Sequence, residues 1–300
     1  MHAVGQAGRL RGAALLSLVT LVWGTTFVVI RALVADRADP LPPGVLTLSR
    51  FAVATALFLP FCRRDPRLWA AGLELGFWLW CGYATQAIGL RHTTVGRSAF
   101  ITVLHVVFVP AMTALAGRRV RSVVWLAAAM ALGGTALLSY DGAPPNRGDA
   151  WTLLTAATYA VYIVRLERYA DRLAPSPLTF VQLAVVTALS CGWVAAERPP
   201  VPAFTWPVLA AAAYLGVAAT AVTTWLSAVG QKTVPGPQAS LLYSLEPVWA
   251  CAFAWLLFAE RFGPSGWAGA GLILAAALLS QWPGRVDPVQ GGQAASPSSS

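Results

Sequence analysis

The chain has 300 residues, of which 57% are hydrophobic and only 11% are charged, whereas a soluble domain carries about 25% charged residues. This composition predicts an all-α integral membrane protein and excludes an ordinary soluble domain. The net charge of +9 does not indicate nucleic-acid binding, because the basic residues lie in short loops between apolar runs instead of gathering on one polar face.

Ten apolar runs, separated by charged or Pro/Gly-rich breaks, predict ten transmembrane helices. They cover residues 13–33, 44–61, 69–90, 98–116, 123–140, 150–164, 178–196, 208–230, 238–259 and 266–281. The run at 150–164 is the shortest, because charged residues follow it closely. Short connections leave no room for a soluble catalytic domain. We expect residues 1–12 to form an N-terminal cytoplasmic segment and the polar residues 284–300 to form a disordered tail.

The distribution of basic residues predicts the orientation in the membrane. With the N-terminus inside, 13 of the 21 Lys and Arg residues fall on the cytoplasmic side, seven fall outside and Arg50 lies within a span. An arrangement with nine helices would remove this excess of cytoplasmic Lys and Arg in one half of the chain. We therefore expect a multi-pass protein of the cell membrane with both termini in the cytoplasm.

The chain contains an internal repeat. Residues 39–57 match residues 171–189 at ten of 19 positions with a fixed offset of 132, and the matches include Asp, Pro and Thr. Trp125 likewise recurs as Trp267. The repeats are predicted at 13–142 and 148–283. Because five helices per repeat is an odd number, the second repeat enters the membrane from the opposite side. Such inverted repeats are typical of secondary transporters that open alternately to the two sides.

Several short motifs resemble the drug/metabolite transporter superfamily, EamA type. They are LVWGTTF at 21–27, Arg50, SAFI at 98–101, Glu246-Pro247 and the helix-ending pair Glu260-Arg261. The resemblance covers nearly all of residues 13–281, and it implies a ten-helix secondary transporter of a family in which many members export amino acids, metabolites or drugs. The first repeat departs from the pattern. It has Arg118-Arg119 where the second has Glu260-Arg261, and Pro110 falls three residues later than Pro247 predicts.

Three ionisable residues fall well within predicted spans: Arg50, His105 and Glu246. An ionisable group at that depth is costly, and it is usually kept because it faces a polar interior or pathway. His105 and Glu246 lie at equivalent points of the two repeats, 141 residues apart. They are candidates for binding a polar substrate or carrying a proton. The alternatives are a packing histidine and an acid bonded to backbone that Pro247 frees.

Arg50 aligns with Gln182 in the other repeat, so a neutral amide can take its place there. We expect both to be structural polar residues, with Arg50 hydrogen-bonded to carbonyls or an acid of a neighbouring helix; direct anion binding by Arg50 is the alternative. Glu74, near the inner end of its span, is expected to pair with Arg63, Arg64 or Arg67. The candidate substrate-binding residues are Trp23, Gln86, His105, Tyr159, Trp225, Tyr243 and Glu246. For the two tryptophans, helix packing is an equally good interpretation.

Among function classes, the sequence favours a secondary transporter that exports a small metabolite, amino acid or drug-like compound by alternating access. It has no GxxxxGK[ST] run for ATP-driven pumping. Its three scattered histidines and four scattered cysteines predict no metal, no cofactor and no catalytic residue, which disfavours an integral-membrane enzyme. A channel or scaffold is the main alternative. The expected partners are a small-molecule substrate and the lipid bilayer, with protons as one coupling option, no nucleic acid, and a monomeric or homodimeric state.

Overall fold

The computed structural model describes residues 5–30, 41–139, 144–200, 205–258 and 263–282, and within these ranges every regular element is a helix. The first repeat contains α1 (Gln6–Ile30), α2 (Pro43–Phe58), α3 (Pro66–Gly89), α4 (Val95–Thr102), α5 (His105–Leu115) and α6 (Ser122–Ser139). The second contains α7 (Arg147–Ala170), α8 (Pro175–Glu197), α9 (Trp206–Gly216), α10 (Thr223–Gly230), α11 (Gly236–Tyr243), α12 (Glu246–Phe258) and α13 (Pro264–Gln281).

Three crossings of the bundle are made of more than one helical segment. The pairs α4/α5 and α11/α12 each follow one path, and the π-helical segment η3 (Val217–Val222) joins α9 to α10. A short 3₁₀ turn, η2 (Leu59–Phe61), extends α2. Counted as paths across the bundle, the described helices number ten, which confirms the predicted fold class. The expected C-terminal tail, the Glu260-Arg261 motif and residues 1–4 of the expected N-terminal segment lie outside the described residues.

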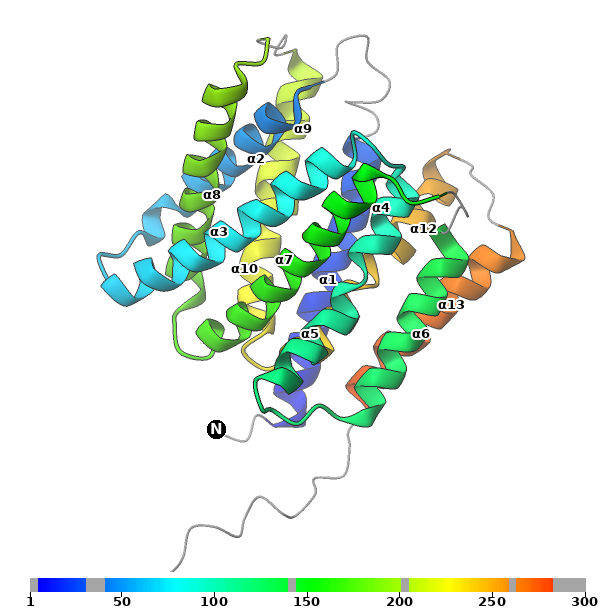
Figure 1. Cartoon of the computed structure of the whole chain (residues 1–300). Helices are drawn as coiled ribbons and strands as arrows, with labels where there is room; N and C mark the ends of the chain where they lie inside the picture. Colours follow the sequence, from blue (N-terminus) through cyan, green and yellow to red (C-terminus); the bar gives the residue numbers. More distant parts are fainter. Residues whose placement is uncertain (1–4, 31–40, 140–143, 201–204, 259–262, 283–300) are drawn as a thin grey trace, which may run out of the picture.

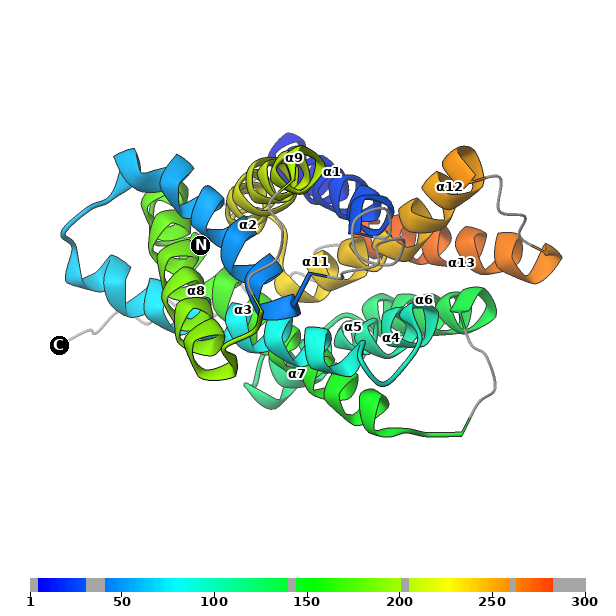
Figure 2. The same cartoon turned by 90° about the horizontal axis from the view of Figure 1, so that it is seen from above.

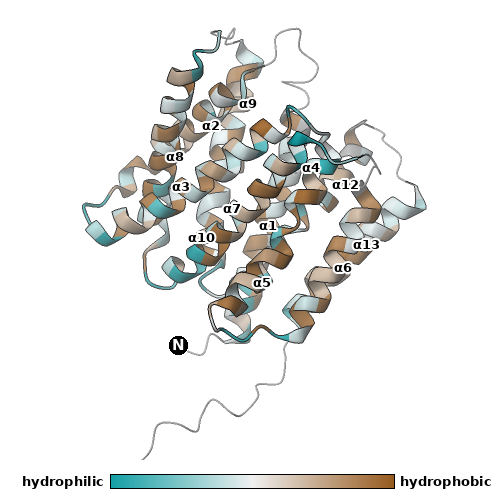
Figure 3. Cartoon of the chain, viewed as in Figure 1, coloured by the Kyte–Doolittle hydropathy of each residue, from teal (hydrophilic) through white to brown (hydrophobic). Residues whose placement is uncertain are grey.

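The helices have the composition of membrane spans. Five of the paths are long and apolar enough to cross a bilayer: Pro43–Phe61, Gly96–Leu115, Pro175–Glu197, Trp206–Gly230 and Gly236–Leu257. Apolar residues dominate the middle of the bundle, and hydrophilic residues concentrate at its two ends and in the loops (Figure 3). This distribution is that of a multi-pass membrane protein.

The helix predicted at 150–164 is wrong in its length, since α7 runs from Arg147 to Ala170. A capping box between Asn146 and Asp149 starts it. Its charged end continues the helix, and two of the charged residues there have partners. Arg165 forms an ion pair with Glu74 of α3, and Glu167 accepts a hydrogen bond from the Gly236 N–H at 3.0 Å.

The partner predicted for Glu74 is also wrong. The structure pairs its carboxylate with Arg165 and with the Tyr169 hydroxyl, both on α7, and not with Arg63, Arg64 or Arg67. The reason is tertiary, because α3 packs lengthwise against α7 and brings the two charged stretches to the same level. These contacts join the two repeats.

The repeats are interleaved. Figure 1 shows α1 and α7 running in opposite directions through the bundle. Each of these first helices packs on the other repeat: α1 contacts α10, α11 and α12, whereas α7 contacts α3, α4 and α5. Viewed from above, the helices of both repeats surround a shared interior, with α2 and α8 on one side and α6 and α13 on the other (Figure 2). Neither repeat can therefore form this interior alone.

Equivalent residues make equivalent contacts across the pseudo-two-fold axis. The hydroxyls of Thr55 and Thr187, which are 132 residues apart, lie 2.8 Å from each other where α2 crosses α8. Two close approaches between backbones also occur at equivalent positions of the repeats. A Cβ on Gly76 would lie 2.8 Å from the Gln182 carbonyl oxygen, and a Cβ on Gly216 would lie 2.9 Å from that of Arg50. The Arg50–Gln182 correspondence found in the sequence is thus a spatial one.

We predict that Gly76→Ala destabilises the protein by about 1–3 kcal/mol, because the new methyl group overpacks the contact between α3 and α8. The matched control is Gly192→Ala in α8, where an added Cβ meets nothing within 4 Å. That change should be neutral or slightly stabilising, since Ala favours a helix over Gly by about 1 kcal/mol. Thermal unfolding in detergent measures both variants. Equal effects of the two substitutions would contradict the close approach at Gly76.

Candidate functional site

Two helix breaks mark equivalent points of the repeats. The path α4/α5 is interrupted at Val103–Leu104, and the path α11/α12 at Ser244–Leu245. His105 and Glu246 are the first residues after the breaks, so the equivalence predicted for them holds in the structure. The spans predicted at 98–116 and 238–259 are both interrupted: Pro247 predicts the kink of the second, whereas the break before His105 in the first is not predicted by the sequence. Discontinuous helices near mid-membrane are where secondary transporters place binding sites.

The two breaks have different local causes. In the second repeat, Pro247 has no N–H, so the Tyr243 carbonyl loses its α-helical donor and the proline ring forces the chain aside. In the first repeat Pro110 lies further along, inside α5. There, the Val106 N–H donates to the Val103 carbonyl at 2.9 Å instead of to that of Thr102. A ring nitrogen of His105, Nδ1, lies 2.7 Å from the Thr102 carbonyl oxygen in its place.

His105 joins the two broken paths. It is buried, and its second ring nitrogen, Nε2, lies 3.2 Å from the Ser240 carbonyl oxygen of α11. Both ring nitrogens therefore face backbone carbonyls of the protein. This geometry is that of a packing histidine at the seam between the repeats, and neither ring nitrogen points to a substrate.

Glu246 is different, because its carboxylate has no partner from the protein. The side chain is half-buried, and among the described residues it makes no hydrogen bond and no ion pair within 4.0 Å. Its charge interacts only at longer range with Arg50 and Tyr159. The bond to freed backbone that the sequence allowed is not formed. A carboxylate inside a membrane bundle must then be hydrated or meet a ligand.

Aromatic side chains from three helices pack together at the second break. The rings of Trp23 and Tyr243 have centroids 5.4 Å apart, and α1 approaches α12 at Gly24 and Trp249. The indole N–H groups of Trp23 and Trp249 are buried without an acceptor among the described residues. Buried polar groups in proteins are normally paired. Two free donors beside a free carboxylate indicate a site that something other than protein completes.

Arg50 holds α2 against the π-helical segment η3. Its Nε donates to the Thr220 hydroxyl at 2.8 Å, and its Nη2 donates to the Ala219 carbonyl at 3.3 Å. The wider turn of a π segment leaves such carbonyls open to side chains. The guanidinium also stacks 5.0 Å from the centre of the Tyr83 ring. The equivalent Gln182 accepts a hydrogen bond from the Tyr162 hydroxyl at 2.9 Å.

The remaining sequence candidates divide into two groups. Tyr159 packs edge-on against Tyr83, with centroids 6.2 Å apart, and donates a hydrogen bond to Gln86 at 3.4 Å. Trp225 lies elsewhere, because its indole donates to Ser176 at 3.1 Å in the first turn of α8. We define the central cluster as the residues that ring contacts, helix spacing or charge interactions link around the second break: Trp23, Arg50, Tyr83, Tyr159, Tyr243, Glu246 and Trp249. Trp249 was not among the candidates, although its spacing of three from Glu246 places both on one helix face.

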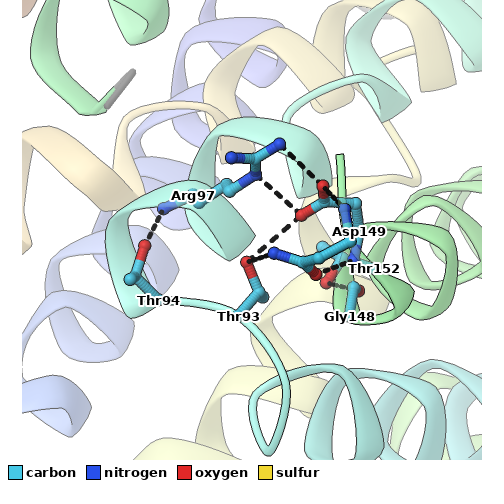
Figure 4. A network of polar contacts seen from close by, with 7 residues as sticks. Thr93, Thr94, Arg97, Gly148, Asp149 and Thr152 are labelled. Atoms are coloured by element: carbon cyan, nitrogen blue, oxygen red, sulfur yellow. Dashed lines mark hydrogen bonds and ion pairs between the residues drawn. The ribbon is translucent and has the colours of Figure 1, made fainter. Parts of the chain in front are cut away.

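An ion pair joins α4 to α7 at one end of the bundle (Figure 4). Arg97 Nε donates to Asp149 Oδ1 at 2.8 Å, and Nη2 lies 2.7 Å from Oδ2. The two side chains are only 9% and 14% exposed. Thr93 and the Asn146 N–H also donate to this carboxylate, at 3.2 and 2.8 Å. A bidentate, shielded pair of this kind is strong and fixes the relative position of the two helices.

The inverted counterpart joins α1 to α11 at the other end. Arg9, in the first turn of α1, donates to the Gln238 side chain at 2.9 Å in the first turn of α11. Glu167 supports the same end, since it accepts from Gly236 and from Arg118, the latter at 2.7 Å. Each end is therefore closed by the first helix of one repeat meeting the broken path of the other.

Comparison with known proteins identifies the architecture. The EamA-like transporter family matches this chain twice, at residues 10–140 and 146–282. Two uncharacterized transporters of Archaeoglobus fulgidus are similar: one is 29% identical over 88% of this chain and 83% of its own length, the other 26% identical over 90% and 96%. A crystal structure with 19% identity superposes with a TM-score of 0.75, covering 90% of this chain and 96% of the other, and shows the same fold.

We predict that Arg50→Gln lowers the free energy of unfolding by about 1–3 kcal/mol, because the Ala219 carbonyl loses a charged donor in a buried position. Thr220→Val, which removes only the acceptor of Nε, should cost less than Arg50→Gln does. Thermal unfolding of the purified variants measures both effects. An Arg50→Gln protein with unchanged stability would show that the contact with η3 does not hold the repeats together.

Proposed function

Because the chain belongs to the EamA-like transporter family, we propose that it is a secondary transporter that exports a small metabolite, amino acid or drug-like compound by alternating access. The observation that carries this proposal is the carboxylate of Glu246, which stands at a helix break in the second repeat and has no hydrogen bond or ion pair among the described residues. Such a group favours a polar pathway over simple packing. Proton exchange at Glu246, uniport and substrate exchange are all compatible with this site.

The closed ends supply the moving contacts of this mechanism. Opening toward one side breaks the Arg97–Asp149 ion pair between α4 and α7, and opening toward the other breaks the Arg9–Gln238 hydrogen bond between α1 and α11. Rocking one repeat against the other separates one contact while the other stays closed. In the proposed cycle, a state in which both contacts are formed, as they are here, is the closed intermediate through which the carrier passes.

The orientation follows from the charge distribution. With 13 Lys and Arg residues on the N-terminal side and seven on the other, we place both termini in the cytoplasm and the protein in the cell membrane. The α1–α11 contact then lies at the cytoplasmic end and the α4–α7 ion pair at the outer end, because α1 and α7 start at opposite ends of the bundle (Figure 1).

Side-selective labelling tests alternating access without a known substrate. In a variant lacking the four native cysteines, Glu246→Cys serves as the reporter, and a second pair of cysteines replaces either Arg97 and Asp149 or Arg9 and Gln238. A short bifunctional thiosulfonate locks each pair. We predict that the first lock leaves the reporter open to an impermeant maleimide only from the cytoplasmic side, and the second only from outside.

The control pair is Thr55→Cys with Thr187→Cys, because this contact lies on the pseudo-two-fold axis and persists in either opening. Locking it should leave the reporter accessible from both sides over time. In a channel, the alternative function, both ends of the pathway are open at the same instant when no pair is locked, so the reporter would be labelled from both sides at once. Under either lock it would be labelled from the side that is open. Labelling would not depend on movement of either end. Lack of labelling in both locked forms would place Glu246 away from the pathway.

A further inference from the structure

We propose that the central cluster takes an organic ammonium ion, meaning a protonated amine carried on an apolar or aromatic body. This substrate class rests on the proposed transport function and makes it more specific. The inference comes from how the two helix breaks differ, and from which charges around Glu246 are already paired.

The first step is a surplus of hydrogen-bond acceptors at the second break. In the first repeat, the Thr102 carbonyl that the break leaves is met by the ring of His105. The equivalent carbonyl of the second repeat belongs to Tyr243, and Pro247 gives it no α-helical donor. The residue equivalent to His105 is Glu246, whose ionised side chain only accepts. In the first repeat the His105 ring meets the carbonyl at the break. In the second repeat the Glu246 carboxylate and the Tyr243 carbonyl are both hydrogen-bond acceptors, and no side-chain donor of a described residue meets them. An ammonium group carries three N–H donors and can supply them.

The second step is the aromatic surroundings of the carboxylate. Trp23, Tyr159, Tyr243 and Trp249 come from α1, α7, α11 and α12. The Trp23 and Tyr243 rings are in contact just before the break, Trp249 lies three residues after Glu246 against Gly24 of α1, and Tyr159 interacts with the Glu246 charge. The faces of aromatic rings attract cations, by about 0.5–2 kcal/mol for each good contact. The same rings offer apolar area to the body of the ligand. A carboxylate among ring faces is therefore complementary to a cation with an apolar attachment.

The third step excludes the opposite charge. An anionic ligand would need Arg50, but this guanidinium is only 7% exposed and already bonded to Thr220 and Ala219 and stacked on Tyr83. It also lies too far from Glu246 for an ion pair, so it does not neutralise that charge by contact. A neutral ligand supplies no counter-charge to an ionised Glu246. A cation does.

The test uses three radiolabelled probes that share one phenyl body: 2-phenylethylammonium, 3-phenylpropionate and zwitterionic phenylalanine. Equilibrium binding to the purified protein and counterflow in proteoliposomes are both measured. We expect saturable binding of phenylethylammonium and at least about tenfold weaker binding of the other two, a difference of one charge-assisted contact. Glu246→Gln should weaken phenylethylammonium binding by a similar factor with thermal stability unchanged. Trp249→Leu should weaken it less.

The matched control is Glu197→Gln, the same chemical change at an exposed acid at the end of α8; it should leave binding as in the wild type. Preferential binding of phenylpropionate or phenylalanine, or the absence of phenylethylammonium binding, would overturn the ammonium assignment. Equal binding by wild type and a folded Glu246→Gln variant would overturn it as well. A different result would contradict the transport proposal alone. In that case phenylethylammonium would bind in a Glu246-dependent way, but its flux into proteoliposomes would not be stimulated by the same compound on the opposite side.

Discussion

A carboxylate embedded in a membrane bundle has to be solvated or paired, and within the described part of the chain Glu246 has no hydrogen bond or ion pair. Much of the architecture can be understood from this constraint. The helix that carries the acid breaks just before it, at the point where Pro247 removes a backbone donor. The first helices of both repeats pack against α11, which leads into this break, and the Trp23 ring of α1 contacts that of Tyr243 just before it. The surroundings of the break therefore come from both repeats.

Inverted duplication gives the molecule two equivalent breaks, and divergence has given them different tasks. In the first repeat His105 fills the break and ties it to the backbone of α11. In the second repeat the break stays open at Glu246. The same contrast recurs between Arg50 and Gln182: the arginine is anchored on the π-helical segment and the amide on a tyrosine. One member of each pair consolidates the structure, and we assign the acid at the remaining position to ligand binding.

The two ends of the bundle differ in strength as well. The α4–α7 contact is a shielded bidentate ion pair with further donors on the same carboxylate, whereas the α1–α11 contact is a single bond between a cation and an amide. Charge-assisted bidentate pairs are the stronger kind. For the exporter proposed above, in the proposed orientation, this difference would favour opening at the cytoplasmic end, where the substrate is loaded.

The amino-acid sequence by itself determined the membrane class, the ten crossings, the duplication and the equivalence of His105 and Glu246, because hydropathy and repeat identity are properties of the chain read locally. It also placed Trp23, Tyr159 and Tyr243 among the candidates. Only the tertiary structure decided that Glu74 pairs with Arg165, that Trp225 lies at the first turn of α8, that Trp249 adjoins the acid, and that the first broken helix is opened by a histidine. These outcomes depend on how each helix is rotated and which helix lies beside it. Contacts between residues far apart in the sequence produce no periodic pattern in it. Which of several charged or aromatic residues forms a given contact is therefore determined by the packing of the helices.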